Sequence, residues 1–206
     1  MRRDPQENAR ALYEIAASQG GYFSAAQARE AGYTYRQQHF HRTRGHWHLI
    51  DRGIFRLRDF PFGEREDLVR WSLWSRNRQG VSQAVVSHET ALTVHELSDV
   101  MPARVHLTVP KRFRKKARSG CVLHFGSLAE AEIELRVGYL VTTPLRTLLD
   151  IAESAVSQEH LDAAVREALE RGLVRRGALS SAPCRPAARI RLDRALAGPG
   201  EGGSGQ

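Results

Sequence analysis

The sequence predicts an α+β fold with two domains, an N-terminal winged helix-turn-helix followed by a mixed α/β domain. Three short segments of helical period come first, two of them with a good capping residue, and an alternating run with a tight-turn signal follows. Beyond residue 64, branched runs typical of strands are interleaved with further helices. From about residue 181, Pro, Ala, Gly and Arg dominate, a composition typical of disorder. We therefore expect domains at 1–60 and 64–180 and a flexible tail at 181–206.

The first domain has the order of a helix-turn-helix core. An amphipathic helix is expected over about 6–18, and it ends at a pair of glycines. Ser24 is a good N-cap for a second helix over 25–31, because its hydroxyl can accept from the first free backbone N–H groups. The third helix is expected to begin after the N-cap Thr34 and to end at Gly45, since glycine readily adopts the left-handed conformation. Together the three helices match a tri-helical DNA-binding core.

A basic β-hairpin is expected directly after the third helix. Asp51-Arg52-Gly53 lies between two runs of aromatic and branched residues, which is typical of a tight turn between strands. In a winged helix the recognition helix lies in the major groove, and the hairpin touches the backbone or the minor groove. The chain has 31 Lys and Arg against 23 Asp and Glu, a net charge of +8. This balance favours a polyanionic partner, here double-stranded operator DNA.

The polar and basic side chains of this region are the candidate DNA contacts. Arg and Gln can read guanine and adenine edges with paired hydrogen bonds, whereas Thr and Tyr suit phosphates. The segment 104–118 holds seven Lys and Arg and no acid. It could extend the footprint on DNA, bind an acidic partner protein, or form a solvated hairpin tip. The candidate DNA-binding residues are Thr34, Tyr35, Arg36, Gln37, Gln38, His39, Arg42, Arg44, Arg52, Lys111, Arg112, Arg114, Lys115 and Lys116.

The sequence leaves the rotation of the third helix open. Tyr33 and Phe40 are its plainly apolar residues, and their spacing of seven places both on one side, which we expect to face inward. One register then turns Tyr35, Gln38 and Arg42 outward, with His39 on the flank of that side. If the helix is rotated by one residue, Arg36 and Gln37 face outward instead.

The second domain carries clear strand and helix signals. Alternating Val and Leu residues predict a strand over 105–109, with 122–125 as its partner. Thr143-Pro144 predicts a helix start, because Pro lacks the N–H that the first turn leaves unpaired. Arg146 and Asp150 are four residues apart on that helix, so we expect a structural ion pair.

No pattern points to catalysis, a cofactor or a metal, and we expect none of them. His39 and His41 are two apart on a helix, so their side chains point roughly 200° away from each other. His88 and His95 share a helix face, but no carboxylate or nucleophile pattern accompanies them, so capping or packing is expected. Glu132-Ile-Glu134 lacks the lysine of a metal-dependent nuclease motif.

The location expected from the sequence is cytoplasmic. No apolar run reaches the length needed to span a membrane, and the first residues lack the apolar core of a signal peptide. The two cysteines, Cys121 and Cys184, are far apart and form no zinc-binding or disulfide pattern.

Three signatures, in order, resemble the AbiEi family of antitoxins, which belong to type IV toxin-antitoxin systems. The winged-helix part of that family is similar to residues 8–57. The matching segments are Gly20-Gly-Tyr-Phe-Ser24, Ala28-Arg-Glu-Ala-Gly32 and Arg52-Gly-Ile-Phe-Arg-Leu57. Two further segments resemble the Ser-His-Glu-Ser-Ala and Pro-x-Arg-Thr-Leu-Leu-Asp signatures that follow the DNA-binding domain. They are Ser87-His-Glu-Thr-Ala-Leu-Thr-Val-His-Glu-Leu97 and Thr143-Pro-Leu-Arg-Thr-Leu-Leu-Asp-Ile-Ala152. The family usually has an aliphatic residue in the middle of the third helix, where this chain has Gln38 and His41.

The resemblance implies an antitoxin that also acts as a DNA-binding transcriptional repressor of its own operon. It further implies a cognate nucleotidyltransferase-type toxin, contacted directly or countered indirectly. Two copies on DNA could arise by dimerisation or by adjacent binding of monomers. The alternatives are a stand-alone winged-helix regulator, whose second domain senses a ligand or another protein, and a DNA-acting nuclease.

Overall fold

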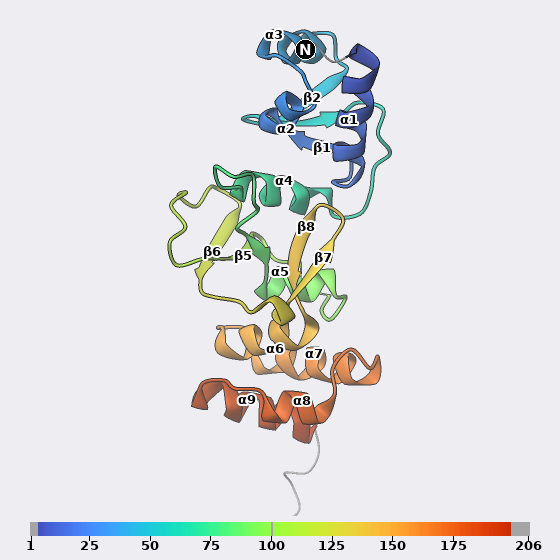
Figure 1. The fold of residues 1–206 in the computed structure, drawn as a ribbon. Coiled ribbons are helices and arrows are strands. Elements are labelled where there is room, and N and C mark those ends of the chain that lie inside the picture. The colour runs from blue at the N-terminus through green and yellow to red at the C-terminus, as the bar shows by residue number, and fades with distance from the viewer. Residues whose placement is uncertain (1–3, 100, 199–206) are drawn as a thin grey trace, which may run out of the picture. The chain divides into compact units, whose positions relative to one another are not determined.

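The computed structural model describes residues 4–99 and 101–198, which form a mixed α+β structure (Figure 1). Nine α-helices, one 3₁₀ helix and two β-sheets lie within these residues. The chain divides into two compact units, residues 1–84 with 135–140 and residues 85–134 with 141–206. Among the described residues, no helix combines the length and the apolar character that crossing a membrane requires.

The first unit begins with three helices and a three-stranded antiparallel sheet of order β1-β3-β2 (Figure 1). Its elements are α1 (Pro5–Ala17), β1 (Tyr22–Ser24), α2 (Ala25–Glu30), α3 (Tyr35–Thr43), β2 (Trp47–Asp51), β3 (Ile54–Leu57) and α4 (Glu66–Ser75). The expected helices and the expected hairpin are present, and Gly53 has the positive φ of 70° that the turn requires. The strand β1 was not expected, because three residues are too few to show an alternating pattern.

Capping side chains determine where α2 and α3 begin. Ser24 Oγ accepts from Gln27 N, and the Gln27 side chain accepts in return from Ser24 N. Thr34 and Gln37 form the same reciprocal pair at the start of α3. Such capping boxes satisfy backbone donors that the first helical turn leaves free, so both predicted N-caps are confirmed.

An aromatic cluster holds the three helices on the sheet. Phe23 is fully buried at its centre, with the Trp47 ring edge-on at 4.9 Å and the Phe55 ring stacked at 5.7 Å. Tyr33 meets Trp47 edge-on at 5.0 Å, which ties the turn before α3 to β2. These contacts fix α3 against the core, because aromatic pairs combine a large buried area with a preferred geometry.

The first unit extends beyond the expected boundary at residue 60, because α4 packs against the small sheet. Arg56 is only 3% exposed and donates to both carboxylate oxygens of Glu66 at 3.1 Å. The hydroxyl of Tyr22 donates to the same carboxylate at 3.1 Å. A buried, bidentate Arg–Glu pair of this kind couples the start of α4 to β3.

The second unit contains most of a five-stranded sheet of order β6-β5-β4-β8-β7 and the remaining helices. The end of β7 and the start of β8 fall in the first unit. The strands are β4 (Val85–Val86), β5 (Val105–Val109), β6 (Cys121–Phe125), β7 (Ile133–Arg136) and β8 (Tyr139–Thr142). The helices are α5 (His88–Val94), the 3₁₀ helix η1 (Glu130–Glu132), α6 (Pro144–Glu153), α7 (Gln158–Glu170), α8 (Arg176–Ser181) and α9 (Pro186–Ala197). Helices α6 to α9 gather beside the sheet of this unit (Figure 1). Their core includes the fully buried Leu148, Ile151, Leu161, Leu179 and Leu192.

The connection between β5 and β6 is not a hairpin. The two strands are parallel, with Val105 opposite Cys121 and Val109 opposite Phe125. The interpretation of the basic segment as a hairpin tip is therefore wrong. Residues 110–120 form a crossover, because parallel neighbours must be joined end to end rather than by a tight turn. Phe113 is buried in this loop.

The expected flexible tail is also wrong for residues 186–197. They form α9, whose Ala188, Leu192, Ala195 and Leu196 are buried against α6 and α7. Arg191 adds hydrogen bonds to the carbonyl oxygens of Ala152 (3.0 Å), Ser154 (2.7 Å) and Val156. The Ala- and Arg-rich composition concealed a short apolar stripe at helical spacing. The part of the tail from residue 199 lies outside the described residues.

Candidate functional site

The outer face of α3 is the first candidate site. Tyr35 is 68% exposed and Phe40 is 48% exposed, and Arg36, His39 and Arg42 are exposed beside them. An Arg42 amino group lies 3.5 Å from Nδ1 of His39. The helix therefore presents cationic and hydrogen-bonding groups to solvent along most of its length.

The rotation of α3 agrees with the second expected register in that Arg36 is exposed and Gln37 partly exposed, but it differs from both registers at Phe40. Gln38 is only 4% exposed, and its Nε2 donates to the carbonyl oxygens of Ala25 (3.2 Å) and Tyr33 (3.1 Å). Gln38 is therefore a packing residue and not a candidate DNA contact. Phe40, expected to face inward, is exposed, because Gln38 and His41 take the inward positions.

His41 supports this packing as a neutral aromatic ring. It stacks on Trp47 at 4.8 Å with an interplanar angle of 14°. Its Nδ1 lies 3.1 Å from Nδ1 of His46. Burial, and secondly the nearby His46, lower the pKa of His41.

Replacing Gln38 by alanine is expected to destabilise the first unit. The change leaves the carbonyl oxygens of Ala25 and Tyr33 without their donor in a buried place, which costs about 1–3 kcal/mol. Chemical denaturation would measure this loss. Arg36→Ala on the exposed face is the control and should stay within about 0.5 kcal/mol of the parent. Equal stabilities of the two variants would contradict the inward position of Gln38.

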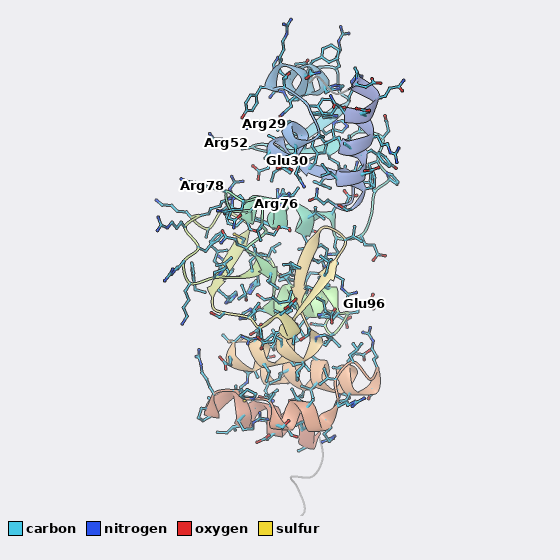
Figure 2. The ribbon with its side chains drawn as sticks, in the orientation of Figure 1. Arg29, Glu30, Arg52, Arg76, Arg78 and Glu96 are labelled. Atoms are coloured by element: carbon cyan, nitrogen blue, oxygen red, sulfur yellow. The ribbon has the colours of Figure 1, made fainter. Side chains whose placement is uncertain are left out.

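Of the other residues predicted to contact DNA, two hold the start of α3 and two are exposed to solvent. Thr34 and Gln37 use their side-chain oxygens in the capping box, so they hold the helix start. Arg44 lies over the Phe40 ring at 5.5 Å, and Arg52 extends into solvent from the turn between β2 and β3 (Figure 2). Arg44 at the end of α3 and Arg52 in the hairpin turn thus add two exposed cations to this unit.

Arg29 of α2 joins the outer face of α3 and was missed in the sequence. Its Nη1 donates to the Tyr35 hydroxyl at 3.3 Å, and its guanidinium lies over the Tyr35 ring. Figure 2 shows Arg29 on the same unit as Arg52. The available signal was its place in the last turn of the helix before α3, where helix-turn-helix proteins approach the DNA backbone.

The second basic segment belongs to the other unit. Lys111, Arg112, Arg114, Lys115 and Lys116 are exposed on the crossover that joins β5 to β6. Partial burial, and secondly the nearby Arg118, lower the pKa of Lys115. These residues form a cationic surface on the crossover, where Phe113 is buried.

A cavity in the second unit brings together residues that the sequence keeps apart. It has a volume of about 480 Å³. The charged and titratable residues that line it come from α5, β5, β6, α6 and the residue before α9. They are His88, Glu89, His106, His124, Arg146, Asp150, Glu153 and Arg185. The sequence indicated His88 and the pair Arg146–Asp150. It did not indicate His106 of β5 and His124 of β6, because these two histidines become neighbours only when the strands pair in parallel.

Close ring and ion contacts define this cavity. The His88 and His124 rings stack at 3.5 Å with an interplanar angle of 12°. His106 Nδ1 lies 3.1 Å from His124 Nε2 and 2.7 Å from Glu89 Oε2. The predicted pair is confirmed, since Arg146 Nε donates to Asp150 Oδ1 at 2.9 Å.

Burial controls protonation in the cavity. Burial, and secondly the neighbouring His124, lower the pKa of His88 to about 3. Burial also raises the pKa of Asp150 to about 6, against the opposing effect of Arg146. Burial, and secondly His106, lower the pKa of His124. Near neutral pH, His88 is thus an uncharged imidazole beside a carboxylate that titrates unusually high.

His95 lies away from this cavity. It is 5% exposed, and its Nε2 lies 2.7 Å from the carbonyl oxygen of Thr142. The packing role expected for His95 is confirmed, whereas His88 is part of the cavity lining.

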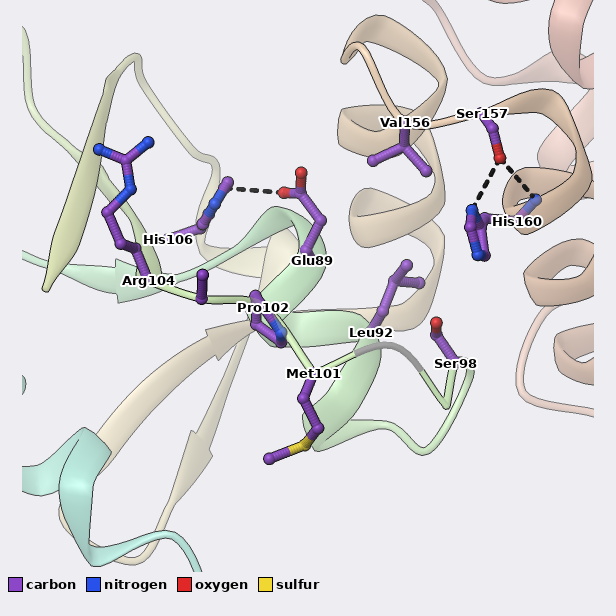
Figure 3. A pocket seen from close by; sticks show the side chains of 11 residues that line it. Glu89, Leu92, Ser98, Met101, Pro102, Arg104, His106, Val156, Ser157 and His160 are labelled. Atoms are coloured by element: carbon purple, nitrogen blue, oxygen red, sulfur yellow. Dashed lines mark hydrogen bonds and ion pairs between the residues drawn. The ribbon is translucent and has the colours of Figure 1, made fainter.

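A smaller cavity of about 330 Å³ shares Glu89 and His106 with the first (Figure 3). Leu92, Met101 and Val156 give it a more apolar wall. In Figure 3 the Glu89 carboxylate points toward the His106 ring, and this pair lines both cavities.

Neither a family model nor a curated protein matches the chain.

Proposed function

We propose that the chain is a DNA-binding transcriptional regulator of antitoxin type, whose first unit is a winged helix. The observation that carries this proposal is the outer face of α3, where Arg36, His39 and Arg42 are exposed while Gln38 holds the opposite face. In the proposed complex α3 enters the major groove, and the β2–β3 hairpin is the wing. A helix fits the major groove, which is about 12 Å wide.

Each exposed group then has a role that its chemistry suits. Arg36 and Arg42 can donate in pairs to guanine edges, and His39 can donate or accept beside them. Arg29 and Tyr35, which are already in contact, suit a phosphate at the start of α3. Arg52 suits a phosphate or the minor groove at the wing. The net charge of +8 adds nonspecific attraction to DNA.

The antitoxin part of the proposal rests on the signatures that resemble AbiEi antitoxins. Residues of both signatures meet in the second unit. His88 and Glu89 of one and Arg146 and Asp150 of the other line the 480 Å³ cavity, and Arg146 is paired with Asp150. Within this proposal the chain acts in the cytoplasm and represses its own operon. It counteracts a nucleotidyltransferase-type toxin, directly or indirectly.

Binding to the DNA upstream of its own gene tests the regulator. The full chain is titrated with that duplex and with an unrelated duplex of equal length across a salt series. We expect binding to the upstream duplex to be at least roughly 1,000-fold tighter at physiological salt, because specific contacts add to phosphate contacts. Equal affinities with equal salt dependence would overturn operator reading.

Co-expression tests the antitoxin separately. A nucleotidyltransferase-type toxin encoded beside this gene is expressed with and without the chain, and colony growth is counted. Rescue of growth by the chain is expected. Growth arrest in both cases, together with specific operator binding, would leave a stand-alone regulator.

A further inference from the structure

We propose that the 480 Å³ cavity of the second unit binds a small, planar organic cation that donates N–H hydrogen bonds, of the amidinium or guanidinium class. The proposal is independent of DNA binding. It stands on an unpaired buried carboxylate oxygen, on the charge balance of the lining and on the aromatic surfaces around it.

Asp150 supplies the unpaired acceptor. Its side chain is 6% exposed, and one oxygen, Oδ1, accepts from Arg146 Nε at 2.9 Å. Within the described part of the chain, the other oxygen, Oδ2, is buried and has no hydrogen-bond partner. A buried carboxylate oxygen without a donor is costly, so a ligand with an N–H group would gain a strong charge-assisted bond there.

The charges of the lining favour a cation over an anion. The carboxyl groups of Glu89, Asp150 and Glu153 line the cavity, against the guanidinium groups of Arg146 and Arg185. Both guanidinium groups are already paired. Arg146 binds Glu132 and Asp150, and Arg185 Nε lies 3.1 Å from Glu153. A phosphate would meet excess negative charge, whereas a cation would offset it.

Hydrogen bonds beside the cavity orient His88. The Thr108 hydroxyl donates to Ser87 Oγ at 2.8 Å, and Ser87 Oγ lies 3.0 Å from His88 Nδ1. His88 also has a positive φ of 51°, a backbone strain that is common at binding sites.

Aromatic faces make a planar ligand the best fit. The stacked His88 and His124 rings lie in the lining, together with Phe125, which is 58% exposed. A planar cation can place its edge against Asp150 and its face against such rings. In the described residues, no three His, Cys, Asp or Glu side chains converge to hold a metal ion. The cavity volume instead suits a molecule of several heavy atoms.

Affinity should depend on pH through Asp150. The charged and titratable groups that face it are Arg146, Glu132, Glu153 and His88, with Glu89, His106, His124 and Arg185 elsewhere around the cavity. Because the pKa of Asp150 is about 6, its charge falls from mostly present at pH 7 to mostly absent at pH 5.

Calorimetric titration of the full chain with benzamidine tests the proposal. We expect binding at pH 7 that weakens roughly tenfold at pH 5. Asp150→Asn should weaken it at least roughly tenfold at pH 7, because the charged acceptor is lost. Glu159→Gln is the matched control, since Glu159 is an exposed carboxylate on α7 away from the lining, and it should bind as the parent does.

Three further probes separate the ligand classes. Tetramethylammonium, which is cationic but has no N–H donor, should bind at least roughly tenfold more weakly than benzamidine. Inorganic phosphate and Zn²⁺ should not compete with it. Tighter binding of phosphate or Zn²⁺ than of benzamidine would overturn the proposal, and so would equal binding to the parent and Asp150→Asn.

If Asp150→Asn does not fold, nuclear magnetic resonance of the parent chain tests binding without a variant. The Cε1–H signals of His88 and His124 should shift when benzamidine is added to the parent chain. The signal of His48 should not shift, because His48 is exposed and does not line the cavity. Unshifted signals of both cavity histidines, or binding that is unchanged between pH 7 and pH 5, would reject the cavity as the site.

Discussion

Replacing Arg36 and Arg42 together by alanine is expected to weaken binding to the operator duplex at least roughly thirtyfold. Each arginine that contacts a base contributes about 1–3 kcal/mol, and the losses of two separate contacts add. Both side chains are exposed on α3, so the free energy of unfolding should change little. Fluorescence anisotropy with labelled DNA would measure the affinity.

A variant with the same loss of charge is the control. Arg10 and Arg58 are exposed arginines of the first unit, each paired with a neighbouring acid, Glu14 and Asp59 respectively. Their double replacement by alanine should weaken binding only severalfold, through the general electrostatic attraction. If the two double variants lose affinity equally and on both duplexes, α3 acts as an unspecific basic surface.

Leu192→Ala is expected to lower the free energy of unfolding by about 3 kcal/mol, the middle of the range for a buried leucine. Leu192 is fully buried in α9, in the same core as Leu161 and Leu179. The truncated side chain would leave a cavity that the surrounding helices fill only in part. Urea denaturation followed by circular dichroism would measure the change.

Ile190→Ala in the same helix is the matched control. Ile190 is 72% exposed, so its truncation should change stability by no more than about 0.5 kcal/mol. Near-equal, small effects of both variants would mean that residues 186–197 do not pack on the second unit. A large effect of Leu192→Ala alone supports α9 as part of its core.

The sequence by itself determined the features that depend on near neighbours. The N-caps Ser24, Thr34 and Thr143 were predictable, because a capping side chain bonds to backbone only two or three residues away. The turn at Gly53 and the ion pair between Arg146 and Asp150 are equally local. Each of these signals is complete within one turn of helix or one hairpin.

Only the tertiary structure decided which side of α3 faces the core. Phe40 is more apolar than Gln38, but the carbonyl oxygens of Ala25 and Tyr33 accept from the Gln38 amide and so stabilise its burial. Those acceptors come from the preceding helix and turn, which periodicity along α3 does not reveal. Hydropathy alone therefore chose the wrong residue.

Contacts between segments far apart in the chain determine which residues line the cavity and where α9 packs. His88, His124 and Asp150 come from three elements far apart in the chain, and they meet because β5 and β6 pair in parallel beside α5 and α6. The short apolar stripe of α9 likewise became meaningful only when α6 and α7 supplied a surface to cover. Local patterns determine where elements begin and end, whereas their partners depend on contacts that close long loops.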